Sequence, residues 1–150
     1  MSNNQKFEAK INDVLTGDTL KNALDFAAFL SANEMIVNGA EVSHDDMVVC
    51  YMHIDGKAEL PGPWTIWTDG DYSSEPEDFT VDEHLKEIAR ANVNKCADCG
   101  AGCSPGKCKV IFGKEIDNVC GASMAFNNPD TATLECVKRL LEMRKHVNNM

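Results

Sequence analysis

Four cysteines lie within the segment KCADCGAGCSPGKC, residues 95–108, where glycine, proline and other small residues separate them. The segment contains no apolar run, so it has little hydrophobic surface with which to join a core. A loop of this composition has few other means of ordering itself, and a bound metal ion would contribute directly to its folding. We therefore treat residues 95–108 as a cysteine-rich loop and a candidate metal site.

The number and setting of the cysteines favour reduced thiols. The chain has 150 residues and seven cysteines, an odd number, and its first residues show no apolar stretch typical of an export signal. A chain of this length can bury a core without crosslinks. We expect one domain spanning residues 1–150, in the cytoplasm, with residues 1–17 loosely packed. Disulfides are the less favoured alternative.

The charge of the chain restricts its partners. The formal net charge of -10 repels a phosphate backbone. The best basic cluster, KRLLEMRKH from Lys138 to His146, lies near the end of a predicted helix, where cations complement the helix dipole. No run of about eighteen apolar residues occurs. We therefore expect neither a nucleic-acid partner nor insertion into a membrane.

Hydrophobic periodicity predicts an α+β fold. Three helices are expected, from Asp18 to about Asn33, from a capping box at Thr80 to about Asn94, and from the cap Asn128 toward the C-terminus. Strands are expected at residues 47–54, 64–68, 109–112 and 119–126. The first two are predicted to form a hairpin, with the turn at residues 55–56. The prediction is a mainly antiparallel sheet of about three to four strands packed by about three helices.

The apolar character of the strand 47–54 predicts that both of its faces are covered. Cys50 lies in that strand, and Cys136 lies on the apolar stripe of the last predicted helix. We expect both to be ordinary buried thiols.

The remaining cysteines are candidate metal ligands. A two-residue gap lets two sulfur atoms approach one ion, and the glycines of the loop allow the required bends. Cys108 lies nearer the loop, but strand alternation places it beside Val110 and Phe112. Ligation by Cys120 would close a longer loop of the chain than ligation by Cys108, and would restrict the unfolded chain more strongly. The predicted ligands are Cys96, Cys99, Cys103 and Cys120, with Cys108 as the alternative fourth ligand.

Zinc is the expected metal, and two alternatives stay open. An iron-sulfur cluster also needs four thiolates, but the spacing C-x2-C-x3-C-x4-C matches neither common ferredoxin pattern. Redox-active thiols are a further alternative. The pair Cys96 and Cys99 follows a predicted helix, however, whereas thioredoxin-like pairs follow a strand and open a helix.

A group of aromatic residues is the second candidate site. Tyr51, His53, Trp64 and Trp67 fall in the predicted hairpin and could line a ligand site, although covering the sheet is their simpler role. The sequence contains no catalytic triad or phosphate-binding loop that we can identify. These features favour a small-molecule or protein binding module over an enzyme, and they leave the oligomeric state open.

The run CADCGAGCSPGKCKVIFGKEIDNVC resembles a group of small uncharacterised bacterial proteins. Those proteins carry a C-x-x-C-G-x-G-C-x-P-G element followed by F-G-K-E-x-D-N-V-C. The resemblance spans most of residues 45 to 147. It implies that the cysteine loop is a defined element of one domain, and it carries no activity to transfer.

Overall fold

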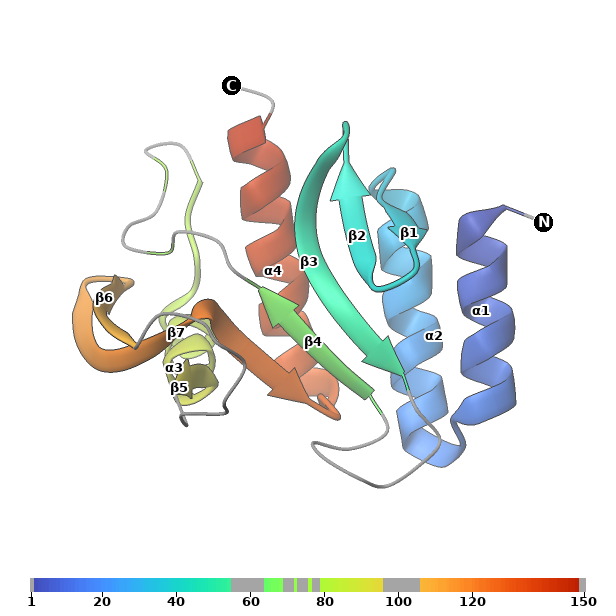
Figure 1. Ribbon diagram of the computed structural model, residues 1–150, viewed down its shortest axis with the longest axis horizontal. Helices are drawn as coiled ribbons and strands as arrows, with labels where there is room; N and C mark the ends of the chain where they lie inside the picture. The colour runs from blue at the N-terminus through green and yellow to red at the C-terminus, as the bar shows by residue number, and fades with distance from the viewer. Residues whose placement is uncertain are drawn as a thin grey trace.

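The computed structural model describes residues 2–54, 64–68, 72, 76, 79–95 and 106–148. These residues form four helices and seven strands. Their arrangement is drawn in Figure 1. The helices are α1 (Asn3–Val14), α2 (Gly17–Ala32), α3 (Glu83–Ala91) and α4 (Thr131–Asn148). The strands are β1 (Ile36–Asn38), β2 (Glu41–His44), β3 (Met47–Ile54), β4 (Trp64–Thr68), β5 (Val93–Lys95), β6 (Lys107–Ile111) and β7 (Lys114–Asn127).

All seven strands join one antiparallel sheet in the order β1-β2-β3-β4-β7-β5, and β6 pairs with β7. The prediction of three to four strands and three helices was therefore wrong. Strands β1, β2 and β5 have only three or four residues, which is too short for a clear alternating pattern. Strand β7 has 14 residues and contains Asn118 and Gly121, which weaken the strand signal in the sequence.

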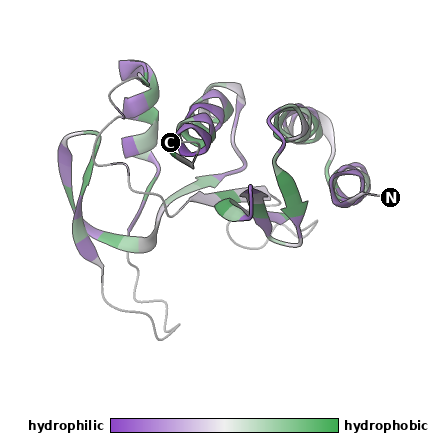
Figure 2. Ribbon diagram, turned by 90° about the horizontal axis from the view of Figure 1, so that it is seen from above, coloured by the Kyte–Doolittle hydropathy of each residue, from purple (hydrophilic) through white to green (hydrophobic). Residues whose placement is uncertain are grey.

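The hydrophobic core lies between the sheet and the helices. Figure 2 shows α2, α3 and α4 on one side of the sheet. Alternate side chains of β4 point toward this side, and Trp64 and Ile66 are fully buried there. Trp64 packs against Phe26 of α2 with ring centroids 6.0 Å apart. The face that carries Trp67 and Tyr51 is the opposite one.

The segment expected to be loosely packed forms α1. Ser2 and Gln5 make a reciprocal capping box at its start, and Phe7 and Ile11 are buried on its inner side. Asn4 lies against β1, a terminal strand of the sheet. Its amide accepts a hydrogen bond from the Val37 N–H (3.0 Å) and donates one to the Met35 carbonyl (3.0 Å), so a helix side chain takes the place of a further strand.

The hairpin of β3 and β4 was predicted correctly, with Tyr51 opposite Trp67. The predicted turn at residues 55–56 lies outside the described residues. The pairing of β2 with β3 shifts register between Val42 and Ser43, and both Val49 and Cys50 are buried at this bulge. Arg144 of α4 donates hydrogen bonds of 3.1 Å to the carbonyls of Val48 and Val49. Helix α4 is thereby tied to the centre of the sheet.

The predicted helices 18–33 and 128 onward correspond to α2 and α4. The predicted cap Asn128 was wrong, because α4 begins at Thr131 and the Asp130 carboxylate accepts a 2.8 Å hydrogen bond from the Thr133 N–H. Helix α3 begins later than expected, because Asp82 and not Thr80 is its N-cap and accepts a 2.8 Å hydrogen bond from the His84 N–H. The helix also ends earlier, since residues 93–95 pair with β7 as strand β5.

Helix α4 buries the six residues of its predicted apolar stripe, which are Leu134, Cys136, Val137, Leu140, Leu141 and Met143. No helix within the described residues is both long enough and apolar enough to cross a membrane.

Candidate functional site

The two ends of the cysteine-rich loop flank one residue of β7. Lys95, the last residue of β5, and Lys107, the first residue of β6, both pair with Val119. A strand can pair with one neighbour along each of its two edges, so β5 and β6 lie on opposite sides of β7 at Val119. Adjacent strands are about 4.8 Å apart, so the loop ends are held about 10 Å from each other.

Three cysteines adjoin this row of paired residues in the sequence. Cys96 follows Lys95, Cys108 follows Lys107, and Cys120 follows Val119. Cys96, Cys99 and Cys103 lie outside the described residues.

Cys108 lies at an irregular point of the β6–β7 hairpin. The register shifts between Lys107 and Lys109, which leaves both Asp117 and Asn118 opposite Cys108. Asn118 has a φ of 59°. The thiol of Cys108 is exposed, as is Val110 on the same strand at 38 %. The burial considered for Cys108 from strand alternation is therefore not found.

The surroundings of Cys108 disfavour its thiolate. Partial desolvation raises the pKa of the thiol, and a hydrogen bond to the Asp117 carboxylate together with the negative charges of Asp117 and Glu115 raises it further. The Lys95 ammonium acts in the opposite direction. Metal ligation requires a deprotonated sulfur, so these carboxylates oppose ligation by Cys108.

Cys120 is partly buried in β7 and has a different neighbourhood. The Lys109 ammonium donates a hydrogen bond of 3.2 Å to the Cys120 carbonyl and one of 3.0 Å to the Ser123 hydroxyl. A fixed cation thus lies beside the backbone of Cys120.

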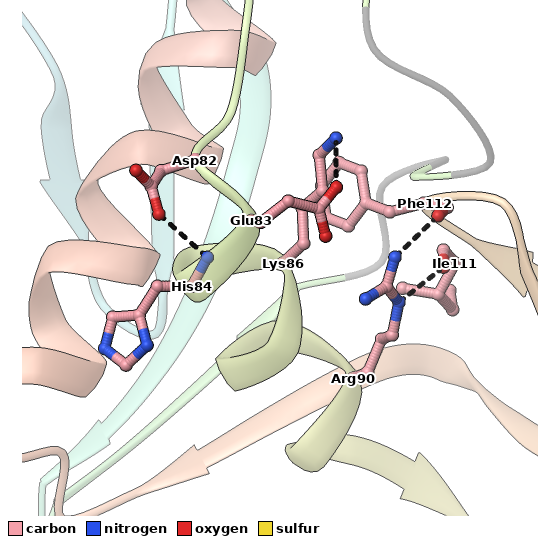
Figure 3. A network of polar contacts seen from close by, with 7 residues as sticks. All are labelled: Asp82, Glu83, His84, Lys86, Arg90, Ile111 and Phe112. Carbon is pink, nitrogen blue, oxygen red and sulfur yellow. Dashed lines mark hydrogen bonds and ion pairs between the residues drawn. The ribbon is translucent and has the colours of Figure 1, made fainter.

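The hairpin that carries both cysteines is held at its tip by α3 and Tyr72. Figure 3 shows the Arg90 guanidinium directed at the carbonyls of Ile111 and Phe112, at 3.3 and 2.7 Å. The N–H of Phe112 donates to the Tyr72 carbonyl at 2.6 Å, and the two rings lie 6.1 Å apart. Phe112 and Gly113 both have positive φ values, as a two-residue type I′ hairpin turn requires.

Sequence reasoning missed Arg90 and Tyr72 because both act across long separations in the chain. Tyr72 is 1 % exposed, and its hydroxyl is hydrogen-bonded to Thr68 at the end of β4. It therefore links the hairpin tip to the central sheet. For Arg90, the available sequence signal was its place on the sheet side of a short predicted helix, where an arginine needs a hydrogen-bond partner.

The structure brings together three of the four aromatic candidates. Tyr51 pairs with Trp67, and the ring centroids of His53 and Trp67 are 6.4 Å apart. Tyr51 and Trp67 are partly buried and His53 is exposed. Trp64 is separated from them, because it points into the core on the other face and packs on Phe26.

In the part of the chain that the structure describes, no three His, Cys, Asp or Glu side chains are grouped so that they could hold a metal ion. The four-thiolate prediction depends on Cys96, Cys99 and Cys103 and therefore stays a prediction. Comparison of the chain with protein-family models, with curated proteins and with solved structures finds no match.

Proposed function

We propose that this chain is a small non-enzymatic binding domain of the cytoplasm in which one structural zinc ion organises the cysteine-rich loop. The observation that carries the proposal is the pairing of Lys95 and Lys107 with the same residue, Val119. This arrangement gives the loop a fixed base and puts Cys120 next to both of its ends. A glycine-rich loop anchored in this way needs only a compact ligand set to close around an ion.

The proposed ligands are Cys96, Cys99, Cys103 and Cys120. Cys120 is preferred over Cys108 because it follows Val119, which pairs with both ends of the loop, whereas Asp117 is hydrogen-bonded to the Cys108 thiol. Four thiolates would give a closed tetrahedral site, which is typical of structural zinc. Such a site also requires reduced thiols, which agrees with the proposed compartment.

Elemental analysis of protein purified without added metal tests the site. We expect about one zinc ion per chain, released by a strong chelator with partial loss of structure. Anaerobic purification followed by visible absorption identifies the main alternative, because an iron-sulfur cluster is coloured and a zinc thiolate site is not. Protein without any bound metal would reject the site and leave thiol redox chemistry as the remaining interpretation.

A matched pair of variants tests the fourth ligand. Cys120→Ser should lower zinc retention far more than Cys108→Ser, and both replacements change a single sulfur atom. Full retention in Cys120→Ser combined with loss in Cys108→Ser would assign the fourth position to Cys108. A thermal unfolding scan on each variant separates lost ligation from a general loss of stability.

The proposed binding surface is the sheet face that carries Tyr51, His53 and Trp67. In Figure 2 this face lies opposite α2, α3 and α4. His53 is exposed on it, whereas Thr65, which pairs with His53, is buried. Aromatic side chains that remain partly accessible on a sheet are typical of interaction surfaces. A protein or a small molecule could use such a surface.

A further inference from the structure

The negative charge of this chain is concentrated in one part of the sequence. Residues 41–78 contain ten Asp and Glu side chains and one Lys, whereas the formal net charge of the whole chain is -10. The rest of the chain is therefore close to neutral. Strands β2, β3 and β4, which carry the aromatic surface, lie within this part of the sequence, and its acidic residues among the described ones are the exposed Glu41, Asp45 and Asp46.

An acidic residue and two aromatic residues form a row across these three strands. Glu41 of β2 pairs with Tyr51 of β3, which pairs with Trp67 of β4. Paired residues of an antiparallel sheet point to the same face, with Cβ atoms about 5 Å apart. The Glu41 side chain is exposed, and the Tyr51 and Trp67 rings are partly accessible. A carboxylate thus lies beside two aromatic rings on this face of the sheet.

We propose that this row, Glu41–Tyr51–Trp67, binds an arginine side chain of a partner protein. The inference rests on the proposed binding function of the sheet face and names the class of its partner. A guanidinium can stack on an indole or phenol ring and pair with a carboxylate at the same time, because it is planar and presents several N–H donors at its edge. Lysine offers a point charge without the planar stacking surface, so arginine is the better fit.

The surrounding charge favours a basic protein segment as the source of that arginine. The net charge of -10 attracts a positively charged chain at long range, which raises the rate of encounter and disfavours acidic partners. The short-range contacts at Trp67 and Tyr51 then provide specificity. The same net charge repels nucleic acid.

The test uses the full zinc-loaded chain and two synthetic peptides. One peptide is a Gly–Ser chain of about ten residues with three arginines, and the other carries three lysines at the same positions. Isothermal titration calorimetry measures both affinities at low and physiological salt. We expect the arginine peptide to bind at least about fivefold more tightly than the lysine peptide. Equal binding of the two peptides would overturn the inference.

Variants locate the contact. Trp67→Ala and Glu41→Gln should each weaken binding of the arginine peptide about fivefold or more, and Trp67→Phe should retain most of it, because a phenylalanine ring still stacks with a guanidinium. The matched control is Asp46→Asn in the β2–β3 turn, which removes one charge of the same acidic region. Asp46 has a φ of 65°, a conformation that asparagine also adopts. A loss in Asp46→Asn as large as that in Glu41→Gln would show charge attraction without a site and would overturn the inference.

Zinc content measured on the same samples separates this inference from the zinc proposal. Unimpaired binding by Trp67→Ala in zinc-loaded protein overturns the arginine site and leaves the zinc site untouched. Protein that is purified without any zinc overturns the zinc site. If this protein still binds the arginine peptide, the arginine site is supported. Circular dichroism confirms that each variant is folded before its affinity is compared.

Discussion

Arg90 of α3 donates a 2.7 Å hydrogen bond to the backbone carbonyl of Phe112, across 22 positions of the sequence. A second hydrogen bond joins the same guanidinium to the Ile111 carbonyl. The Arg90 side chain thus holds the turn of the β6–β7 hairpin against helix α3. Because the proposed ligand Cys120 lies on one strand of that hairpin, we expect the proposed metal site to depend on this contact.

Replacing Arg90 with alanine should destabilise the protein by about 1–3 kcal/mol, since two carbonyls lose a charged donor in a partly buried place. Urea unfolding followed by circular dichroism measures the change. Glu83→Gln on the same helix is the control. It removes a surface ion pair with Lys86 (3.3 Å), which contributes at most about 1 kcal/mol. An equal effect of both changes would argue against the hairpin clamp.

We expect the free energy of unfolding to fall at alkaline pH because the buried Tyr72 loses its proton. Burial raises the pKa of Tyr72 to about 12 from an ordinary value of 10.0, against the opposing effects of the Thr68 hydrogen bond and the Arg144 charge. The folded protein therefore favours the neutral phenol. Its contribution is fully present below pH 10 and is lost as pH rises through 12, by about 2–3 kcal/mol in total.

The free energy of unfolding, measured from pH 8 to 11.5, checks this expectation. Tyr72→Phe should flatten the alkaline part of the profile, because it removes the titrating group while keeping the buried ring. Tyr51→Phe on the opposite face should keep the fall. A profile for Tyr72→Phe that falls as steeply as that of the parent protein would contradict the assignment.

The thiols should differ in their reactivity. Cys50 and Cys136 are 0 % and 1 % exposed, and burial raises the pKa of Cys136 to about 12. The Cys136 thiol also donates a 3.3 Å hydrogen bond to the Leu85 carbonyl. A thiol reagent at pH 8 should label both residues only after unfolding, whereas exposed Cys108 should react in the native protein, faster as pH rises.

Peptide mapping by mass spectrometry identifies the labelled residues. Protection of Cys108 that disappears when the metal is removed would make it a ligand and would overturn the choice of Cys120. Rapid native labelling of Cys50 would contradict its place in the core.

The sequence by itself determined the long elements of this protein. The apolar stripes of α2 and α4 and the apolar run of β3 are long enough for their periodicity to outweigh neighbouring residues, and Leu134, Val137 and Leu141 are buried as their spacing predicts. The hairpin of β3 and β4 followed from the same local signals. The acidic charge and the grouping of the cysteines are also properties of the sequence alone.

Tertiary structure decided the rest, because the deciding contacts join distant residues. Strands β1, β2 and β5 are too short to be recognised and exist through pairing with their neighbours. Strand alternation alone puts Trp64 and Trp67 on opposite faces of β4, but only the register of β3 with β4 puts Tyr51 directly opposite Trp67. Likewise, no local pattern predicts that Lys95 and Lys107 pair with the same residue, Val119, since each pairing is decided by strand geometry around a 14-residue β7.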